Sequence, residues 1–292
     1  MKILKNRIKT QNQGNNLVNN IKKPFKISWT ELISSKKGIL LYSILMFLFV
    51  YWFMSIYDPE LFAGFEDFYD NFPPEILQMI GGQLSLAEFG GFVNTYIFAF
   101  AWMYMGIYLI IRSSQDIPKE IDNKTIDIML SKPIKRWQFV SGKYIQHLIV
   151  TIGLAIAAWY GMLIGLLTVP ALQDIEIYLG EIILAFFWMT LFLIAIVSTG
   201  FFFSTFLRTR LSLAVSFGAF IFFYVAGIFS GMMPKDIEGI KYTSFFYYFD
   251  PSNLLLNHNL DLVGLHMIVL LVYSISITAL AVIIFNKRDI PV

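Results

Sequence analysis

The chain has 292 residues, 57% of them apolar and 14% charged, and a soluble globular core of this size would not need so many apolar side chains. Its formal net charge of +2 is too small to indicate nucleic acid as a partner. It contains no cysteine, which excludes disulfides, thiol nucleophiles and thiolate metal sites.

The first 37 residues are polar and basic, and they divide into two parts. Residues 1–23 are rich in Asn, Gln and Lys, so we expect a disordered basic tail with no signal-peptide pattern. In residues 24–37, Trp29, Leu32 and Ile33 recur at helical spacing, and Lys36 and Lys37 follow. This pattern favours a short amphipathic helix in the membrane interface. The alternative is a basic flank that only sets the topology.

Residues 38–292 predict an all-α membrane domain with six transmembrane helices. A bilayer core about 30 Å thick needs about 20 apolar residues in a helix. Six stretches meet that test and contain no Asp, Glu, Lys or Arg: 38–57, 92–111, 145–169, 182–207, 211–233 and 265–285. Their length favours helices, because strands of a membrane barrel are about 10 residues long and alternate apolar with polar positions.

The basic residues predict the orientation of these spans. Twenty of the 22 lie before the first span, between spans two and three, between spans four and five, or after the last span. The opposite loops are acidic and hold only Lys235 and Lys241. Basic loops stay in the cytoplasm, so we expect both termini there and a multi-pass protein of the cell membrane.

The segment between spans two and three, residues 112–144, is the most informative polar stretch. Asp122 is expected to cap a helix, and Pro133 to end it at Lys132, giving a helix of about ten residues. Ile126, Met129 and Leu130 would share one face of it. With no core of its own to cover that stripe, the helix is expected to dock in a groove of a partner. The alternative is a solvated loop whose periodicity is accidental.

This segment carries a family resemblance. Glu120, Thr125, Ile126, Leu130, Ser131, Pro133, Ile134, Arg136 and Lys143 resemble the cytoplasmic signature of ABC-2 type permeases, although Lys124 and Lys135 stand where that family usually has Gly and Ser or Thr. Two outer segments are also similar to the family: 72–77 with the glycine pairs 81–82 and 90–91, and 244–251. The resemblance extends from Phe25 almost to the end of the chain.

The resemblance implies that 38–292 is a permease domain of an ATP-binding cassette exporter. Its cytoplasmic helix would be the coupling helix that docks on the ATPase, through Glu120, Thr125, Ile126, Met129, Leu130, Pro133 and Arg136. The chain lacks a GxxxxGK[ST] phosphate loop, so we expect ATP and Mg²⁺ on a separate ATPase subunit and no catalytic residue or cofactor here. Two permease subunits, as a homodimer or heterodimer, would surround a path lined by spans two and five, which nominates Asn94, Tyr96, Phe100, Phe217 and Phe220.

Two further patterns bear on packing and chemistry. Gly153, Ala157, Gly161 and Gly165 recur every four residues in span three, which indicates close helix packing, either within one subunit or at a dimer seam. The three histidines, His147, His258 and His266, are scattered, and we expect interfacial side chains and no metal site. The aromatic run 245–249 is interpreted as a membrane-interface anchor, with an outer gate as the alternative.

Two other classes of function stay open. An ion-coupled secondary transporter normally keeps carboxylates or broken helices at mid-membrane, and none of the six apolar stretches has an acidic residue. A non-enzymatic membrane scaffold is the second alternative.

Overall fold

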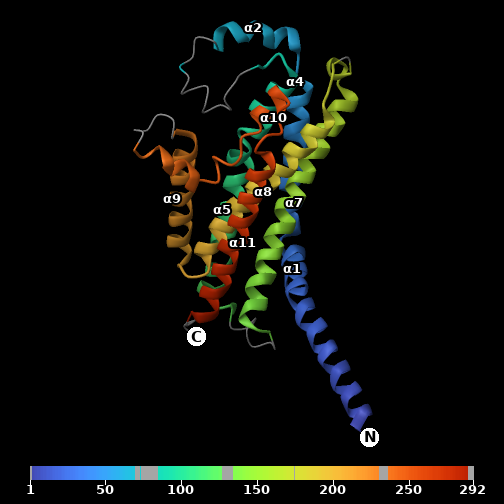
Figure 1. The fold of residues 1–292 in the computed structure, drawn as a ribbon, viewed down its shortest axis with the longest axis vertical. Coiled ribbons are helices and arrows are strands. Elements are labelled where there is room, and N and C mark those ends of the chain that lie inside the picture. The colour runs from blue at the N-terminus through green and yellow to red at the C-terminus, as the bar shows by residue number, and fades with distance from the viewer. Residues whose placement is uncertain are drawn as a thin grey trace.

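A computed structural model of the chain describes residues 2–69, 73, 85–126, 134–173, 175–229 and 236–288, with side chains from residue 22 onward except those of 65–69. The described residues form helices and no strands. Six helical stretches are long and apolar enough to cross a membrane, which confirms an all-helical, six-span, multi-pass membrane protein. Figure 1 shows them side by side. We call the end of this bundle where α1 begins and α11 ends the lower end, and the opposite end, where α2 and α10 lie, the upper end.

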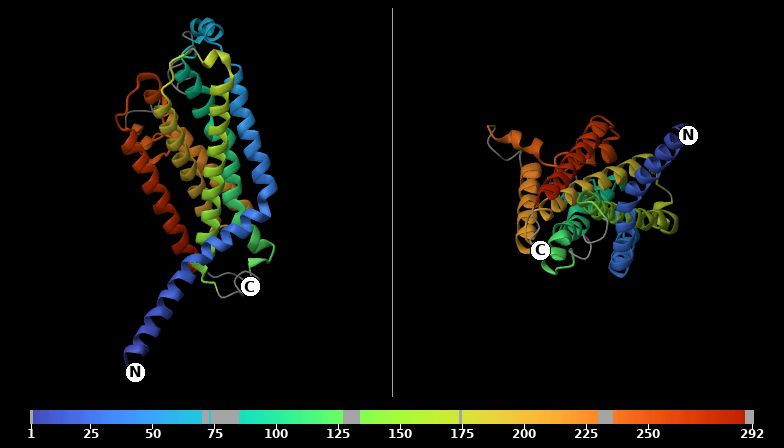
Figure 2. Two further views of the ribbon diagram at one scale, coloured as in Figure 1. Left: turned by 90° about the vertical axis from the view of Figure 1, so that its right-hand side faces the viewer. Right: turned by 90° about the horizontal axis from the view of Figure 1, so that it is seen from below.

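The first helix, α1 (Lys2–Ser55), is longer than the sequence indicates. It contains Pro24 and includes both the stretch expected to be a disordered tail and the expected interfacial helix. The expected disordered tail is helical here, whereas the helix expected over 24–37 is present as part of α1, and its position in the membrane interface stays a prediction. Figure 2 shows that α1 bends, so that its N-terminal part runs obliquely away from the bundle.

The second span is interrupted by two π-helical stretches. It consists of α4 (Phe89–Val93), η1 (Asn94–Phe98), η2 (Trp102–Gly106) and α5 (Ile107–Asp122). π-Bulges inside helices are often found at functional sites. Aromatic rings join this span to α1 in three steps: Tyr42 on Tyr108 at 4.0 Å, Phe49 on Tyr104 at 4.8 Å, and Phe53 on Tyr96 at 5.1 Å between centroids.

The third span, α7 (Arg136–Thr168), packs along α1 and ends before the short η3 (Pro170–Leu172). The small residues of the predicted stripe divide between two environments. A Cβ at Gly161 would collide with the backbone oxygen of Phe47, and one at Gly165 with the side chain of Met54, both in α1. Ala157 is half-buried, and Gly153 has open space beside it. Two of the four positions thus serve close packing within this chain.

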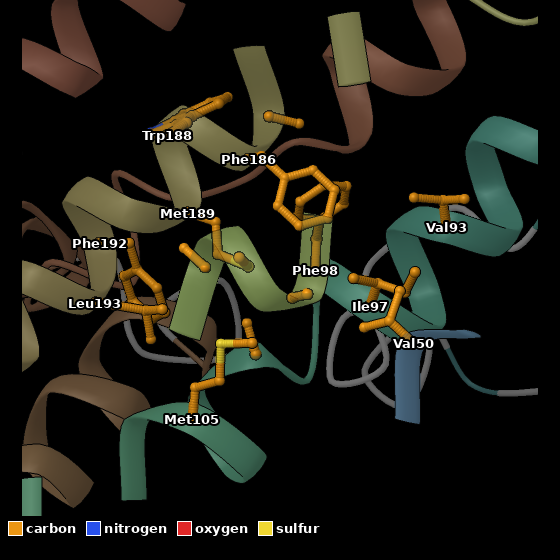
Figure 3. Packing of buried hydrophobic residues seen from close by; sticks show 14 of the residues in the cluster. Val50, Val93, Ile97, Phe98, Met105, Phe186, Trp188, Met189, Phe192 and Leu193 are labelled. Carbon is orange, nitrogen blue, oxygen red and sulfur yellow. The ribbon is translucent and has the colours of Figure 1, made fainter. Parts of the chain in front are cut away.

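The central helix of the bundle is α8 (Leu179–Ser204), which contacts α5, α7, α9 (Thr209–Ile228) and α11 (Val263–Lys287). Figure 3 shows part of the core, where Phe98 of η1 lies under Phe186 of α8, with 5.0 Å between the ring centroids. The same hydrophobic cluster also includes Val50 of α1 and Met105 of η2.

The upper end carries the short helices α2 (Pro59–Tyr69), η5 (Glu238–Thr243) and α10 (Ser252–Asn257). Phe245 and Phe246, which follow η5, are buried against Phe192 of α8. The interpretation of this run as an interface anchor is therefore wrong for these two residues, because they pack inside the bundle.

The helices extend past the apolar stretches that predicted them, mainly at the lower end. The second span continues from 111 to Asp122, and the third begins at Arg136, nine residues before the expected start at 145. These extensions are polar, so they need partners to remain helical and buried. Those partners form the candidate site.

Candidate functional site

The candidate site surrounds the connection between α5 and α7 at the lower end. Helix α5 ends in a Schellman motif: the N–H of Thr125 donates to Glu120 O at 2.9 Å, and that of Lys124 to Ile121 O at 3.0 Å. Lys124 has a left-handed backbone with φ of 56°, the position that glycine usually occupies in this motif. Asp122 is thus the last residue of α5, and its predicted role as an N-terminal cap is wrong.

Ile126 begins the next helical turn and is buried inside this chain, with 1% of its surface exposed. It belongs to a small apolar cluster at the lower end with Ile117, Phe139, Val140, Phe201, Ala281 and Phe285. The stripe expected to be free for a partner therefore starts with a residue that the chain covers itself. Met129, Leu130 and Pro133 lie outside the described residues.

A buried ion network stands beside this connection. Lys143 of α7 is 1% exposed, and its Nζ lies 3.0 Å from Glu31 Oε1 of α1 and 3.3 Å from Asp116 Oδ1 of α5. It also contacts Glu120 Oε1 of α5. One ammonium group thus binds carboxylates from two other helices. A buried lysine without such partners would carry a large desolvation cost.

His147 extends the network by one turn of α7. It is fully buried, and its Nε2 lies 3.0 Å from Asp116 Oδ2. When Asp116 is a carboxylate, Nε2 must be the donor, so the two oxygens of Asp116 are divided between His147 and Lys143. Nδ1 of His147 is buried and has no partner among the described residues. His147 thus has a buried partner within this chain, and its position at the membrane interface stays a prediction.

Sequence reasoning missed this network, although a signal was present. Asp116 and Glu120 are four residues apart, and so are Lys143 and His147, which places two acids on one helix face and two basic groups on another. The network lies beyond the apolar stretch 92–111, at the lower end. It therefore does not supply the mid-membrane carboxylates that an ion-coupled transporter would use.

Hydrogen bonds tie both ends of the connection to the remaining helices. At the α5 end, Thr209 of α9 donates its hydroxyl to Asp122 Oδ2 at 2.6 Å. At the α7 end, Arg136 donates to the backbone oxygen of Arg288 after α11, and Arg288 in turn donates to Thr205 O at 2.9 Å. A displacement of the connection would therefore be transmitted to α1, α9 and α11 together.

The nominated pathway residues lie in the second and fifth spans, as expected from their positions in the sequence. Tyr96 packs against Phe53 of α1, and Phe220 of α9 is buried with its ring 5.9 Å from that of Trp102. Asn94 is buried in η1, while Phe100 and Phe217 are half-buried. The rings of Phe217 and Phe220 lie 6.5 Å apart, and the role of all five residues in transport stays a prediction.

A cavity of about 370 Å³ opens at the upper end. Its wall includes Tyr57, Glu88, Glu176, Glu181 and His258, and the His258 Nδ1 lies 2.8 Å from Glu181 Oε2. Tyr57, the last residue of the first predicted span, donates its hydroxyl to Ala87 O at 2.6 Å. None of the nominated pathway residues lines this cavity.

The described contacts at the lower end join the α5–α7 connection to the other helices of the bundle. Among the described residues there is no group of three or more His, Asp or Glu that could hold a metal ion. What the site contains is a connection whose two ends are held by buried charges and hydrogen bonds from the rest of the bundle.

Comparison with known proteins agrees with the fold. The model of the family described as ABC-2 family transporter protein matches residues 25–290. A search of curated proteins finds no match to this chain.

Proposed function

Since the chain belongs to the ABC-2 family of transporter proteins, we propose that it is the permease subunit of an ATP-binding cassette exporter that uses ATP hydrolysed by a separate subunit. The observation that carries this proposal is the family match over 25–290 together with the linked ends of the α5–α7 connection. Export, rather than import, is inferred from the family resemblance.

We propose that fewer residues contact the ATPase than the sequence indicates. Glu120, Ile126 and Arg136 make their described contacts within this chain, so we assign them to holding the base of the connection. Thr125 is exposed and donates its hydroxyl to Glu120 O at 3.1 Å, which gives it the same role. Residues 127–133, including Met129, Leu130 and Pro133, are then the part that docks.

Closure of the ATPase pair on its nucleotide would supply the free energy. Changing a pathway from 1:99 to 99:1 in favour of the outward-facing state takes about 5.5 kcal/mol of differential binding. In the proposed cycle the ATPase displaces residues 127–133, and Lys143 and Asp122 carry that displacement to α1 and α9. A second permease subunit would complete the central path.

The docking test replaces Met129 and Leu130 together with Asp. Two charges on an apolar docking stripe should abolish co-purification of the ATPase subunit while membrane insertion is retained. The matched control is Leu260→Asp with Leu262→Asp, two exposed leucines at the upper end, which should leave co-purification unchanged. ATPase recovery equal to that of the unchanged protein in the Met129/Leu130 variant would contradict the proposed docking site.

The orientation test uses the absence of native cysteine. We propose that the lower end is cytoplasmic, because the basic loops gather there. Leu260→Cys at the upper end is expected to react with a membrane-impermeant maleimide in intact cells, and Trp137→Cys at the lower end only after permeabilisation. The reverse pattern would place the connection outside the cell and exclude an ATPase partner there.

A further inference from the structure

Arg112 lies just past the apolar part of the second span, where α5 leaves the predicted hydrocarbon region at the lower end. It is half-buried between α5 and α1. Its Nη2 donates to Ser35 Oγ of α1 at 2.7 Å, and its Nη1 to Tyr108 OH at 3.3 Å. These two neutral oxygens are the only acceptors it has among the described residues.

The charge of Arg112 has no counterion within this part of the structure. No carboxylate of a described residue lies within 4.0 Å of its guanidinium, because Glu31 and Asp116 both bind Lys143 instead. A guanidinium carries five N–H donors, and two of them are used here. Nε is buried and has no acceptor among the described residues.

The described side chains around Arg112 supply neither a counterion nor a further acceptor for its guanidinium. Ser35 donates its hydroxyl to Glu31 O at 2.8 Å, and it also receives a bond of 3.5 Å from Gln146 Nε2 of α7. The lysines that follow Ser35, Lys36 and Lys37, are exposed. Arg112 thus makes no direct ion pair among the described residues, and two exposed lysines follow its partner Ser35 in α1.

Depth and charge together favour an anionic partner from the bilayer. An arginine at the end of an apolar span lies at the headgroup level of the adjoining leaflet. Guanidinium binds phosphate through two parallel N–H···O bonds, and basic side chains at this level attract anionic lipids. A half-buried guanidinium without a counterion is costly, and a lipid phosphate would provide one.

We propose that Arg112, oriented by Ser35 and supported by Lys36 and Lys37, binds the phosphate of an anionic phospholipid in the leaflet at the lower end. The terminal nitrogens Nη1 and Nη2 each keep one N–H for the two phosphate oxygens, because each uses the other for Tyr108 or Ser35. Because Ser35 belongs to α1 and Arg112 to α5, the lipid would hold these two helices together beside the Lys143 network. This site does not depend on the partnership with an ATPase.

The test measures lipid binding to the purified full chain in detergent. Thermal stability is followed while phosphatidylglycerol is added, and native mass spectrometry counts retained lipid. Arg112→Gln should need about tenfold or more phosphatidylglycerol for half-maximal stabilisation, as expected for loss of hydrogen bonds to a charged group. Arg210→Gln, which removes an exposed arginine at the same end, should bind as the unchanged protein does.

Each alternative result has a defined meaning. Equal binding by Arg112→Gln and the unchanged protein would overturn the site. Equal stabilisation by zwitterionic phosphatidylcholine would overturn the anionic preference, and stabilisation by inorganic phosphate alone would replace the lipid with a soluble anion. If Arg112→Gln is not recovered as a monodisperse protein, the same lipid titration is carried out on Arg112→Lys. A lysine keeps the charge but cannot bind two oxygens in parallel, so weaker binding is expected. Binding equal to that of the unchanged protein would refute the proposed geometry.

Discussion

Replacing Lys143 with Met tests the network that joins α1, α5 and α7. The substitution keeps an unbranched apolar stem but removes the ammonium group that contacts Glu31, Asp116 and Glu120. Removing one partner of a buried ion pair costs about 3–5 kcal/mol, because the remaining charge stays desolvated. The three carboxylate side chains keep 17–22% exposure, so we expect a loss near the lower limit, about 3 kcal/mol.

The assay is reversible unfolding of the purified chain in mixed micelles by SDS titration. Lys241→Met serves as the control, because it removes a surface pair with Glu238, 2.7 Å long, and should change stability far less. Adding Glu120→Gln to Lys143→Met should restore part of the loss, since one stranded charge is then removed. A loss below about 1 kcal/mol for Lys143→Met, or no recovery in the double variant, would refute the reasoning.

Three further substitutions test the packing of the lower end and of α7, each by the same unfolding assay. Lys124→Gly should stabilise the chain by about 1 kcal/mol, because glycine adopts the left-handed backbone without strain. The control Lys119→Gly, in the preceding helical turn, should cost about 1 kcal/mol. A loss of stability in Lys124→Gly would contradict the Schellman end of α5. Ile126→Ala should cost about 2–5 kcal/mol if Ile126 is buried within this chain, and a change near zero would show that it is free for a partner. Gly161→Ala should cost about 1–3 kcal/mol, because the added Cβ would collide with α1. The control Gly153→Ala has open space beside it and should be neutral or stabilising. Similar effects at both positions would argue against the α1–α7 contact.

The membrane fold could be predicted from the sequence because each span is a local apolar run. The six stretches need only the length and composition of about 20 neighbouring residues, and the structure places a helix at each. The helix limits at the lower end could not be predicted in the same way. Residues 112–122 and 136–144 are polar, and they are helical where Lys143 meets carboxylates 23, 27 and 112 positions away in the chain.

The connection between α5 and α7 shows the same limit on a smaller scale. Asp122 has the side chain of an N-terminal cap, and local pattern alone favours that assignment. Its actual role is decided by Thr209, a residue 87 positions away, and by the left-handed Lys124 that ends α5. Ile126 likewise matches a docking stripe in sequence, but the side chains that cover it come from α5, α7, α8 and α11.

The network also explains how a small displacement could reach distant helices. Lys143, Asp122 and Arg136 each bind a different neighbour of the connection, so a displacement of the end of α5 or the start of α7 would change at least one of these contacts. Rigid packing between α1 and α7 at Gly161 and Gly165 would carry such a movement along the whole length of the first span. In the proposed cycle, the buried ion network is the expected point of transmission between the proposed docking segment and the membrane.

The central claim is that residues 127–133 face an ATPase subunit, and site-specific photo-crosslinking in living cells tests it most directly. A photoreactive amino acid at Leu130 is predicted to capture a protein with a GxxxxGK[ST] phosphate loop, identified by mass spectrometry of the crosslinked band. The same residue placed at Leu260, exposed at the upper end, should not capture that protein. Capture of the ATPase from Leu260, or of no nucleotide-binding protein from Leu130, would contradict the account.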